Sequence, residues 1–235
     1  QMGIEVLVPD VNVSASDFIG VDRPGESPAI SFGLSAVRNV GEGLVSLILA
    51  EREANGTFVD FFDFCDRVDV SVLNKRTIES LIKAGGFTSL GHTRKGLLGC
   101  FDLIIDDTVA RRRKESEGQF DLFSMSDDDE TSSSARIDIP DDEFEKRQRL
   151  AFEKEMLGLY VSDHPLMGAE ASLRRRTECT IAELEGVDDG SMKTIGGLVT
   201  NLQKKWTRKG DLMAVFTLED LQSNIEVMVF PKTMQ

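Results

Sequence analysis

The first half of the chain takes its fold from SFGLSAVRNVGEGLVSLILA, residues 31–50. Apolar residues recur there at three- and four-residue steps on both sides of the short segment VGEG at 40–43, a spacing typical of amphipathic helices. The stretch therefore predicts two helices joined by a tight turn. A second unit of the same kind follows in NKRTIESLIKAGGFTSLG, residues 74–91. We expect residues 31–110 to form an all-α domain of compact paired helices.

A helix, a turn of the form hydrophobic-Gly-x-Gly and a second helix make a helix-hairpin-helix. This arrangement can hold a nucleic-acid backbone without reading a base, because glycines let the backbone approach a phosphate and the second helix offers its N-terminal amides. The candidate contacts are Gly41 and Gly43, with Arg38 adding charge. The same glycines would serve equally well in a plain interhelical turn. In the second unit the glycines are not spaced as G-x-G, which also suits a packing role, and the candidate DNA contacts are Lys75, Arg76, Lys83 and Gly85.

A net charge of −14 argues at first against nucleic acid, since duplex binding needs cations. The charge is unevenly spread, however. Between Ser124 and Glu143 eight acidic residues face the single Arg136, a local charge of −7 and half of the total. This stretch is also rich in serine and nearly free of apolar residues, so it cannot bury enough surface to become ordered. We predict a disordered acidic linker over residues 124–143.

Directly before the linker, a basic helix end, RRRKE at 111–115, leads into GQFDLF at 118–123. A short segment with a glutamine, a leucine and a final phenylalanine is typical of a peptide that docks into an apolar surface pocket, because the apolar side chains supply energy and the amide fixes the register. The alternative is a helix tail packed on the helical domain. The candidate docking residues are Gln119, Phe120, Asp121, Leu122 and Phe123.

The C-terminal part changes its period. After a helical connector over 144–190, the segments TIGGLVTNLQ (194–203), DLMAVFTLED (211–220) and NIEVMVFP (224–231) predict three β-strands of a truncated barrel in residues 191–235. We expect KKWTRKGD, residues 204–211, to form a basic loop between the first two strands. There Trp206 could stack on a base of single-stranded DNA, or the loop could simply be solvated. The cations that would follow the phosphates are Lys204, Lys205, Arg208 and Lys209.

Several classes of site are not indicated. Cys65, Cys100 and Cys179 stand far apart without a C-x-x-C pair, so the sequence suggests neither a zinc site nor a disulfide framework. His92 and His164 are expected to be structural. The apolar runs are too short to cross a bilayer and no signal peptide begins the chain, so we expect a cytoplasmic protein with no membrane partner.

Several long stretches resemble consecutive motifs of one family, the alpha subunit of bacterial DNA polymerase III, the C-family of replicative DNA polymerases. They are SFGLSAVRNVGEG, FFDFCDRVDVSVLNKRTIESLIKAGGFTSLG, RLAFEKEMLGLYVSDHPL and GGLVTNLQKKWTRKGDLMAVFTLEDLQSNIEVMVFP. The resemblance covers nearly the whole chain. It implies that residues 1–30 end a fingers domain, that 31–110 form a tandem helix-hairpin-helix domain, that 119–123 bind the β sliding clamp, and that 191–235 belong to an OB-fold.

Position 1 is not methionine, so we expect the chain to be a piece of a longer protein. The resemblance implies that this longer protein is a DNA-directed DNA polymerase. The Mg²⁺-binding carboxylates of that enzyme would lie in a palm domain upstream, so this fragment is expected to hold no catalytic residue and no cofactor. Its expected partners are DNA, the β sliding clamp and other replisome subunits. The expected fold class is multidomain α+β. Two alternatives stay open, namely a stand-alone repair or recombination adaptor and the error-prone paralogue of the same polymerase.

Overall fold

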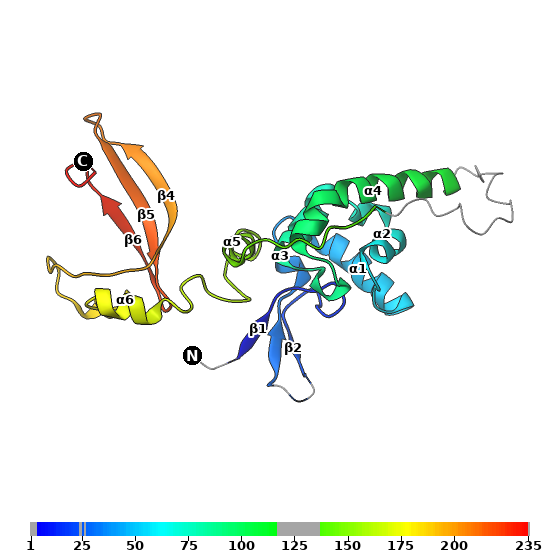
Figure 1. Ribbon diagram of the computed structural model, residues 1–235, viewed down its shortest axis with the longest axis horizontal. Coiled ribbons are helices and arrows are strands. Elements are labelled where there is room, and N and C mark those ends of the chain that lie inside the picture. Colours follow the sequence, from blue (N-terminus) through cyan, green and yellow to red (C-terminus); the bar gives the residue numbers. More distant parts are fainter. Residues whose placement is uncertain (1–3, 24, 26, 117–136, 235) are drawn as a thin grey trace. The chain divides into compact units, whose positions relative to one another are not determined.

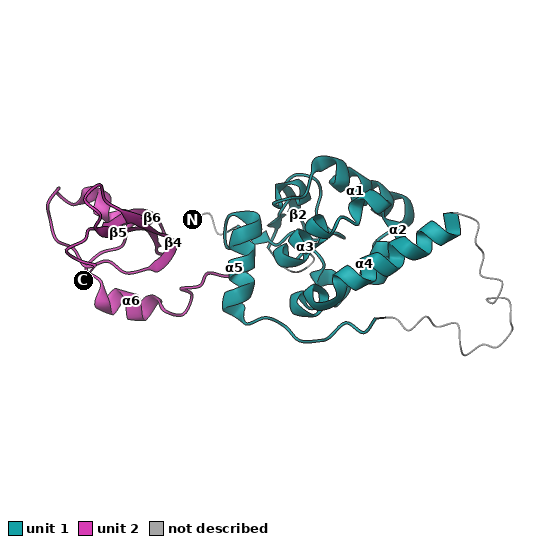
Figure 2. Ribbon diagram, turned by 90° about the horizontal axis from the view of Figure 1, so that it is seen from above, with its two compact units in different colours: residues 1–162 teal, residues 163–235 magenta. Residues whose placement is uncertain are grey.

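The computed structural model describes residues 4–23, 25, 27–116 and 137–234 (Figure 1). The chain divides into two compact units, Gln1–Ser162 and Asp163–Gln235 (Figure 2). Helices dominate the first unit and each unit holds a three-stranded sheet, so the fold class is α+β, as predicted. The predicted connector 144–190 spans the boundary between the two units.

A small mixed sheet begins the first unit. Its strands are β1 (Glu5–Leu7), β2 (Ile19–Val21) and β3 (Ala29–Ser31), with β3 in the centre, parallel to β1 and antiparallel to β2. The sheet is joined to the helical body, because the amide of Val11 donates to the carbonyl of Gly86 at 2.9 Å. Phe18 and Phe32 also pack edge to face, with ring centroids 4.5 Å apart.

The helical body follows directly. Its elements are η1 (Leu34–Ala36), α1 (Glu42–Asn55), α2 (Phe61–Arg67), η2 (Val70–Val72), α3 (Lys75–Ala84), η3 (Thr88–Leu90), α4 (Arg94–Ser116) and α5 (Lys146–Leu157). The first predicted helix is only the 3-10 turn η1. It ends early because Val37 is already extended and Asn39 is left-handed, with φ 65°.

Aromatic rings form the centre of the helical body. Phe87 lies edge to face against Phe61 and Phe64, with centroids 5.1 and 5.0 Å away. Around them pack residues of α3 and α4 at three- and four-residue spacing, which is the period that predicted these helices. The fully buried members of this layer are Ile78, Leu81, Ile82, Leu97 and Ile104.

Residues 137–143 correct one prediction. They were expected to belong to the disordered linker, but they follow a defined path along the start of α4. Ile137 and Ile139 pack half-buried against the core, and the Thr93 hydroxyl donates to the carbonyl of Asp142 at 2.6 Å. A Cβ on Gly96 would stand 1.9 Å from the carbonyl oxygen of Pro140, so only glycine admits this segment.

The second unit contains α6 (Glu170–Arg176), η5 (Ala182–Gly186) and the strands β4 (Leu198–Trp206), β5 (Leu212–Glu219) and β6 (Asn224–Val229). The strands form an antiparallel sheet in the order β4-β5-β6, with a bulge between Thr200 and Gln203. Asp220 ties the sheet to the preceding segment, because its carboxylate accepts from the amide of Ile181 at 2.7 Å. The three predicted strands are therefore present.

Candidate nucleic-acid interface

The first hairpin is the turn between η1 and α1, defined here as residues 38–43. Its backbone is held from α3: the Asn39 amide group donates to the Ser80 hydroxyl at 3.0 Å, and the Thr77 hydroxyl donates to the Asn39 carbonyl at 3.3 Å. Thr77 and Ser80 are each only 3% exposed, so these contacts are fixed parts of the fold. Sequence reasoning missed Asn39. Its signal is an asparagine before a glycine turn, since asparagine tolerates the left-handed region better than most residues.

The N-terminus of α1 is open. Gly41 is the N-cap and no side chain caps the helix, so the amides of Glu42 and Gly43 can donate to an outside group. A Cβ built on Gly41 or Gly43 would meet no atom within 4 Å. Gly41 has φ −84°, a conformation open to any residue. Neither glycine is needed for packing, and both leave free space in front of a helix end that favours anions.

Two arginines lie in the elements concerned, Arg38 in the first hairpin and Arg76 in the first turn of α3. Arg38 and Arg76 are exposed, and neither side chain makes a hydrogen bond or ion pair with another described residue. The two predicted lysines, unlike the arginines, are paired with carboxylates of the chain itself. Lys75 bonds to Asp106 of α4 at 2.8 Å, and Lys83 pairs at 2.7 Å with a glutamate one turn earlier in α3. Of the four predicted cations in this unit, the two arginines are the ones available to a phosphate.

The second hairpin, between α3 and α4, is closed by the chain itself. The carboxylate of Glu143 accepts from the amides of Arg94 and Lys95 at 3.2 and 3.3 Å, and the amide of Gly96 donates to a threonine hydroxyl at 3.0 Å. Gly85 is buried with φ 90°, and a Cβ there would stand 2.6 Å from the Arg94 guanidinium. Gly85 is thus corrected from a DNA contact to a packing position, because the backbone and Arg94 both require glycine.

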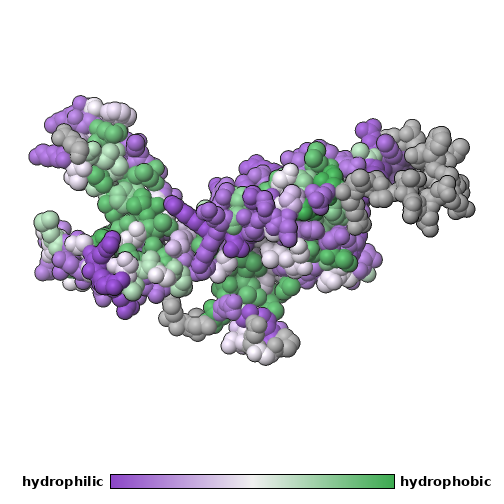
Figure 3. Space-filling model, in the orientation of Figure 1, coloured by the Kyte–Doolittle hydropathy of each residue, from purple (hydrophilic) through white to green (hydrophobic). Residues whose placement is uncertain are grey.

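A second exposed surface lies on the β4–β5 hairpin. Lys204, Lys205 and Trp206 belong to strand β4, not to a loop as predicted, because the strand pairs as far as Trp206 opposite Leu212. Trp206 is 72% exposed, and it shares a strand face with Lys204. The remaining two predicted cations, Arg208 and Lys209, lie in the tight turn that follows and are exposed. Figure 3 shows apolar residues gathered over this sheet.

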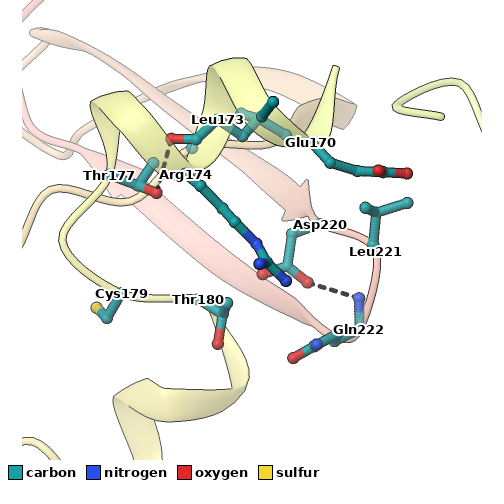
Figure 4. A pocket seen from close by; sticks show the side chains of 11 residues that line it. Glu170, Leu173, Arg174, Thr177, Cys179, Thr180, Asp220, Leu221 and Gln222 are labelled. Atoms are coloured by element: carbon teal, nitrogen blue, oxygen red, sulfur yellow. Dashed lines mark hydrogen bonds between the residues drawn. The ribbon is translucent and has the colours of Figure 1, made fainter. Parts of the chain in front are cut away.

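A cavity of about 380 Å³ lies in the second unit between α6 and the β5–β6 turn (Figure 4). The Arg174 side chain extends toward Asp220 there. Burial alone would raise the pKa of Asp220, but hydrogen bonds from the amides of Ile181, Gln222 and Ser223 hold it below its usual value. This carboxylate is occupied by the backbone, and the cavity presents no paired nucleophile and base.

A metal centre and a reactive thiol are two further kinds of site that a chain can hold. Among residues 4–116 and 137–234, apart from positions 24 and 26, no group of three His, Cys, Asp or Glu could hold a metal ion. Burial raises the pKa of the thiols of Cys65 and Cys100, which makes both poor nucleophiles.

Within the same described part of the chain, no helix is long and apolar enough to cross a membrane. The predicted docking residues 119–123 lie outside the described residues.

Comparison with known proteins agrees with the hairpin geometry. A family model described as a helix-hairpin-helix motif matches residues 3–97. The chain is 44% identical over its full length to the DNA polymerase III subunit alpha of Saccharopolyspora erythraea, covering 20% of that protein. It is 42% identical to the subunit of Mycobacterium tuberculosis over 99% of this chain and 20% of that one.

A third relative is also similar over the whole of this chain. The DNA polymerase III subunit alpha of Thermus aquaticus is 39% identical over the whole of this chain and 18% of its own length. The chain thus spans about one fifth of the length of the curated relatives it matches. Over its entire length, this chain is similar in sequence to about one fifth of the length of the DNA polymerase III alpha subunits.

Proposed function

We propose that this chain holds the DNA duplex for a replicative DNA polymerase through its first hairpin. The observation that carries the proposal is the uncapped N-terminus of α1, where Gly41 and Gly43 leave open space. The exposed Arg38 belongs to the same hairpin, and the exposed Arg76 lies in the first turn of α3, the helix that holds the hairpin. Backbone amides and arginines that face a phosphate recognise no base, so the grip is independent of sequence. Such a contact suits an enzyme that must move along its product.

Fluorescence anisotropy with a short labelled duplex tests this function. We expect weak binding that is alike for unrelated sequences and falls steeply as salt rises, because phosphate contacts release counterions. Substituting valine for both Gly41 and Gly43 should abolish most of the affinity while the far-UV circular dichroism stays unchanged. Undiminished affinity in that folded variant would contradict the proposal.

For residues 119–123 we propose binding to the β sliding clamp. The support is the resemblance of Gln119, Phe120, Asp121, Leu122 and Phe123 to the family's internal clamp motif, together with the similarity of the whole chain to DNA polymerase III alpha subunits. We expect a peptide of residues 118–124 to bind the clamp in the micromolar range, about −8 kcal/mol. Equal binding by a peptide with Leu122→Ala and Phe123→Ala would contradict the assignment.

The strands β4 to β6 are proposed to be part of an OB-fold that guides single-stranded template. The support is a strand that ends in an exposed tryptophan beside lysines and a basic turn, a combination suited to stacking and phosphate contact. We expect Trp206 fluorescence to be quenched by single-stranded oligonucleotides. A Trp206→Phe variant serves as the blank. An unchanged signal at saturating oligonucleotide would remove this surface from the proposal.

The parent protein is proposed to be a DNA-directed DNA polymerase of the bacterial cytoplasm, with residues 1–30 closing its fingers domain. Its Mg²⁺-dependent chemistry is proposed to lie in segments other than this one, as the resemblance to the polymerase family implies. Duplex grip, clamp tether and template contact can each be weak. Linked in one chain they raise the effective concentration of polymerase at the primer end, and processivity follows.

A further inference from the structure

We propose that α5 is a brace for the first hairpin and that the buried Arg94–Glu153 ion pair is a positioning pair for duplex binding. The proposal rests on the proposed function, and it assigns a role there to two residues outside the hairpin. It also gives α5, which the sequence suggested to be a connector, a part in the DNA grip.

The brace contacts the hairpin through the backbone. The amide of Arg38, the first residue of the hairpin, donates to the carbonyl of Met156 in the last turn of α5 at 2.9 Å. Met156 is 5% exposed and belongs to the same buried cluster as Val37 and Val40, which flank the start of the turn. A helix from beyond the acidic stretch thus fixes where the hairpin begins.

The ion pair holds α5 in place. Arg94 donates from Nη2 to Oε1 of Glu153 at 2.9 Å, and the glutamate is fully buried. Arg94 also donates to the carbonyls of Lys83, at 3.2 Å, and Arg149, at 3.4 Å, so it joins the end of α3 to α5. α3 and α5 lie side by side (Figure 1). Because a buried charge without its partner is costly, the pair selects one position for α5.

Glu153 also secures the chain after α5. Its carboxylate accepts from the amides of Val161 and Ser162 at 3.2 and 3.0 Å, and from the Ser162 hydroxyl at 2.8 Å. The helix is thereby anchored on both sides of its C-terminus. Removing the carboxylate charge should loosen α5, and the Arg38 amide would then lose its acceptor.

The test compares Glu153→Gln with Glu51→Gln in the full chain. Glu51 pairs with Arg67 at 3.0 Å, half-buried in the same unit and away from α5, so its variant controls for general destabilisation. In Glu153→Gln we expect exchange of the Arg38 amide to speed up, and the dissociation constant for duplex to rise, each by about tenfold. The slope of log affinity against log salt should also become shallower by about one for each phosphate that the variant no longer binds.

The salt slope separates positioning from mere instability, since partial unfolding lowers the active fraction without changing the slope. A folded Glu153→Gln with wild-type exchange at Arg38 and wild-type duplex affinity overturns the proposal. Should that variant not fold, hydrogen exchange in the wild type decides: the amides of Arg38, Val161 and Ser162 must open together, and independent opening of Arg38 overturns the brace. Absence of duplex binding by the wild type would sink the proposed function and with it the role of the ion pair in binding, while the exchange result still judges the brace.

Discussion

Replacing Gly43 by alanine should move fold stability and DNA affinity in opposite directions. In the free chain the added methyl group meets no atom within 4 Å, and Gly43 lies in the first turn of α1. Alanine loses less conformational entropy than glycine in a helix, so the fold should gain between zero and about 1 kcal/mol. In the complex the same methyl group stands where a phosphate must approach.

The size of the binding loss follows from the bonds at stake. A hydrogen bond from a backbone amide to a charged phosphate contributes about 1.5–3 kcal/mol. Losing one of them raises the dissociation constant by about 10- to 100-fold. The assays are thermal unfolding for stability and anisotropy of a labelled duplex for affinity, both at one fixed salt concentration.

Gly99→Ala is the matched control. Gly99 is an exposed glycine in α4 whose Cβ would likewise meet no atom within 4 Å, and it lies outside the first hairpin. It should gain similar stability, about 1 kcal/mol or a few degrees in Tm, with unchanged duplex affinity. The reasoning is refuted if Gly43→Ala is stable and still binds duplex as tightly as Gly99→Ala does.

Three further predictions concern stability and reactivity. Gly85→Ala should destabilise the first unit by more than about 1 kcal/mol in urea unfolding, since the residue has φ 90° and a guanidinium packs where the methyl group would stand. A thiol reagent at neutral pH should label the half-exposed Cys179 in the native protein but reach the buried Cys65 and Cys100 only on unfolding; rapid native labelling of all three would contradict their burial. Because the folded state lowers the pKa of Asp220, its contribution is present above the unfolded pKa of about 3.9 and is lost as pH falls further. The Tm of the second unit should therefore fall on acidification, and Asp220→Asn should flatten that dependence.

Local patterns were sufficient for the regular elements. Apolar steps of three and four predicted α3 and α4, which each bury one face. Short alternating or continuous apolar segments predicted β4 to β6, of which the central strand β5 is the one with buried residues. The glycine turn at 40–43 also marked the start of α1 correctly. In each of these cases the signal lies within about a dozen consecutive residues, so no knowledge of distant neighbours was needed.

Where the prediction departed from the structure, residues far apart in the sequence decide. Gly85 resembled a phosphate contact, but the space beside it is filled by Arg94, which Glu153 of α5 holds from 59 residues farther along the chain. Residues 137–143 have the composition of a linker, but the Glu143 carboxylate accepts from amides at the start of α4, and Ile139 packs against the core. Glu153 is buried because it pairs with Arg94, which lies in another helix. Since α5 is rich in charged residues, its sequence alone gives no sign that this glutamate is buried.

Amide mapping by NMR tests the central claim most directly. With a short blunt duplex added to the isotope-labelled chain, we predict shifts of the amides of Gly41, Glu42 and Gly43, at the open start of α1. The amides of Lys95 and Gly96 should stay in place, because groups of the chain itself already accept from them. Shifts confined to the second hairpin, or none in the first, would contradict the proposal that residues 38–43 hold the duplex.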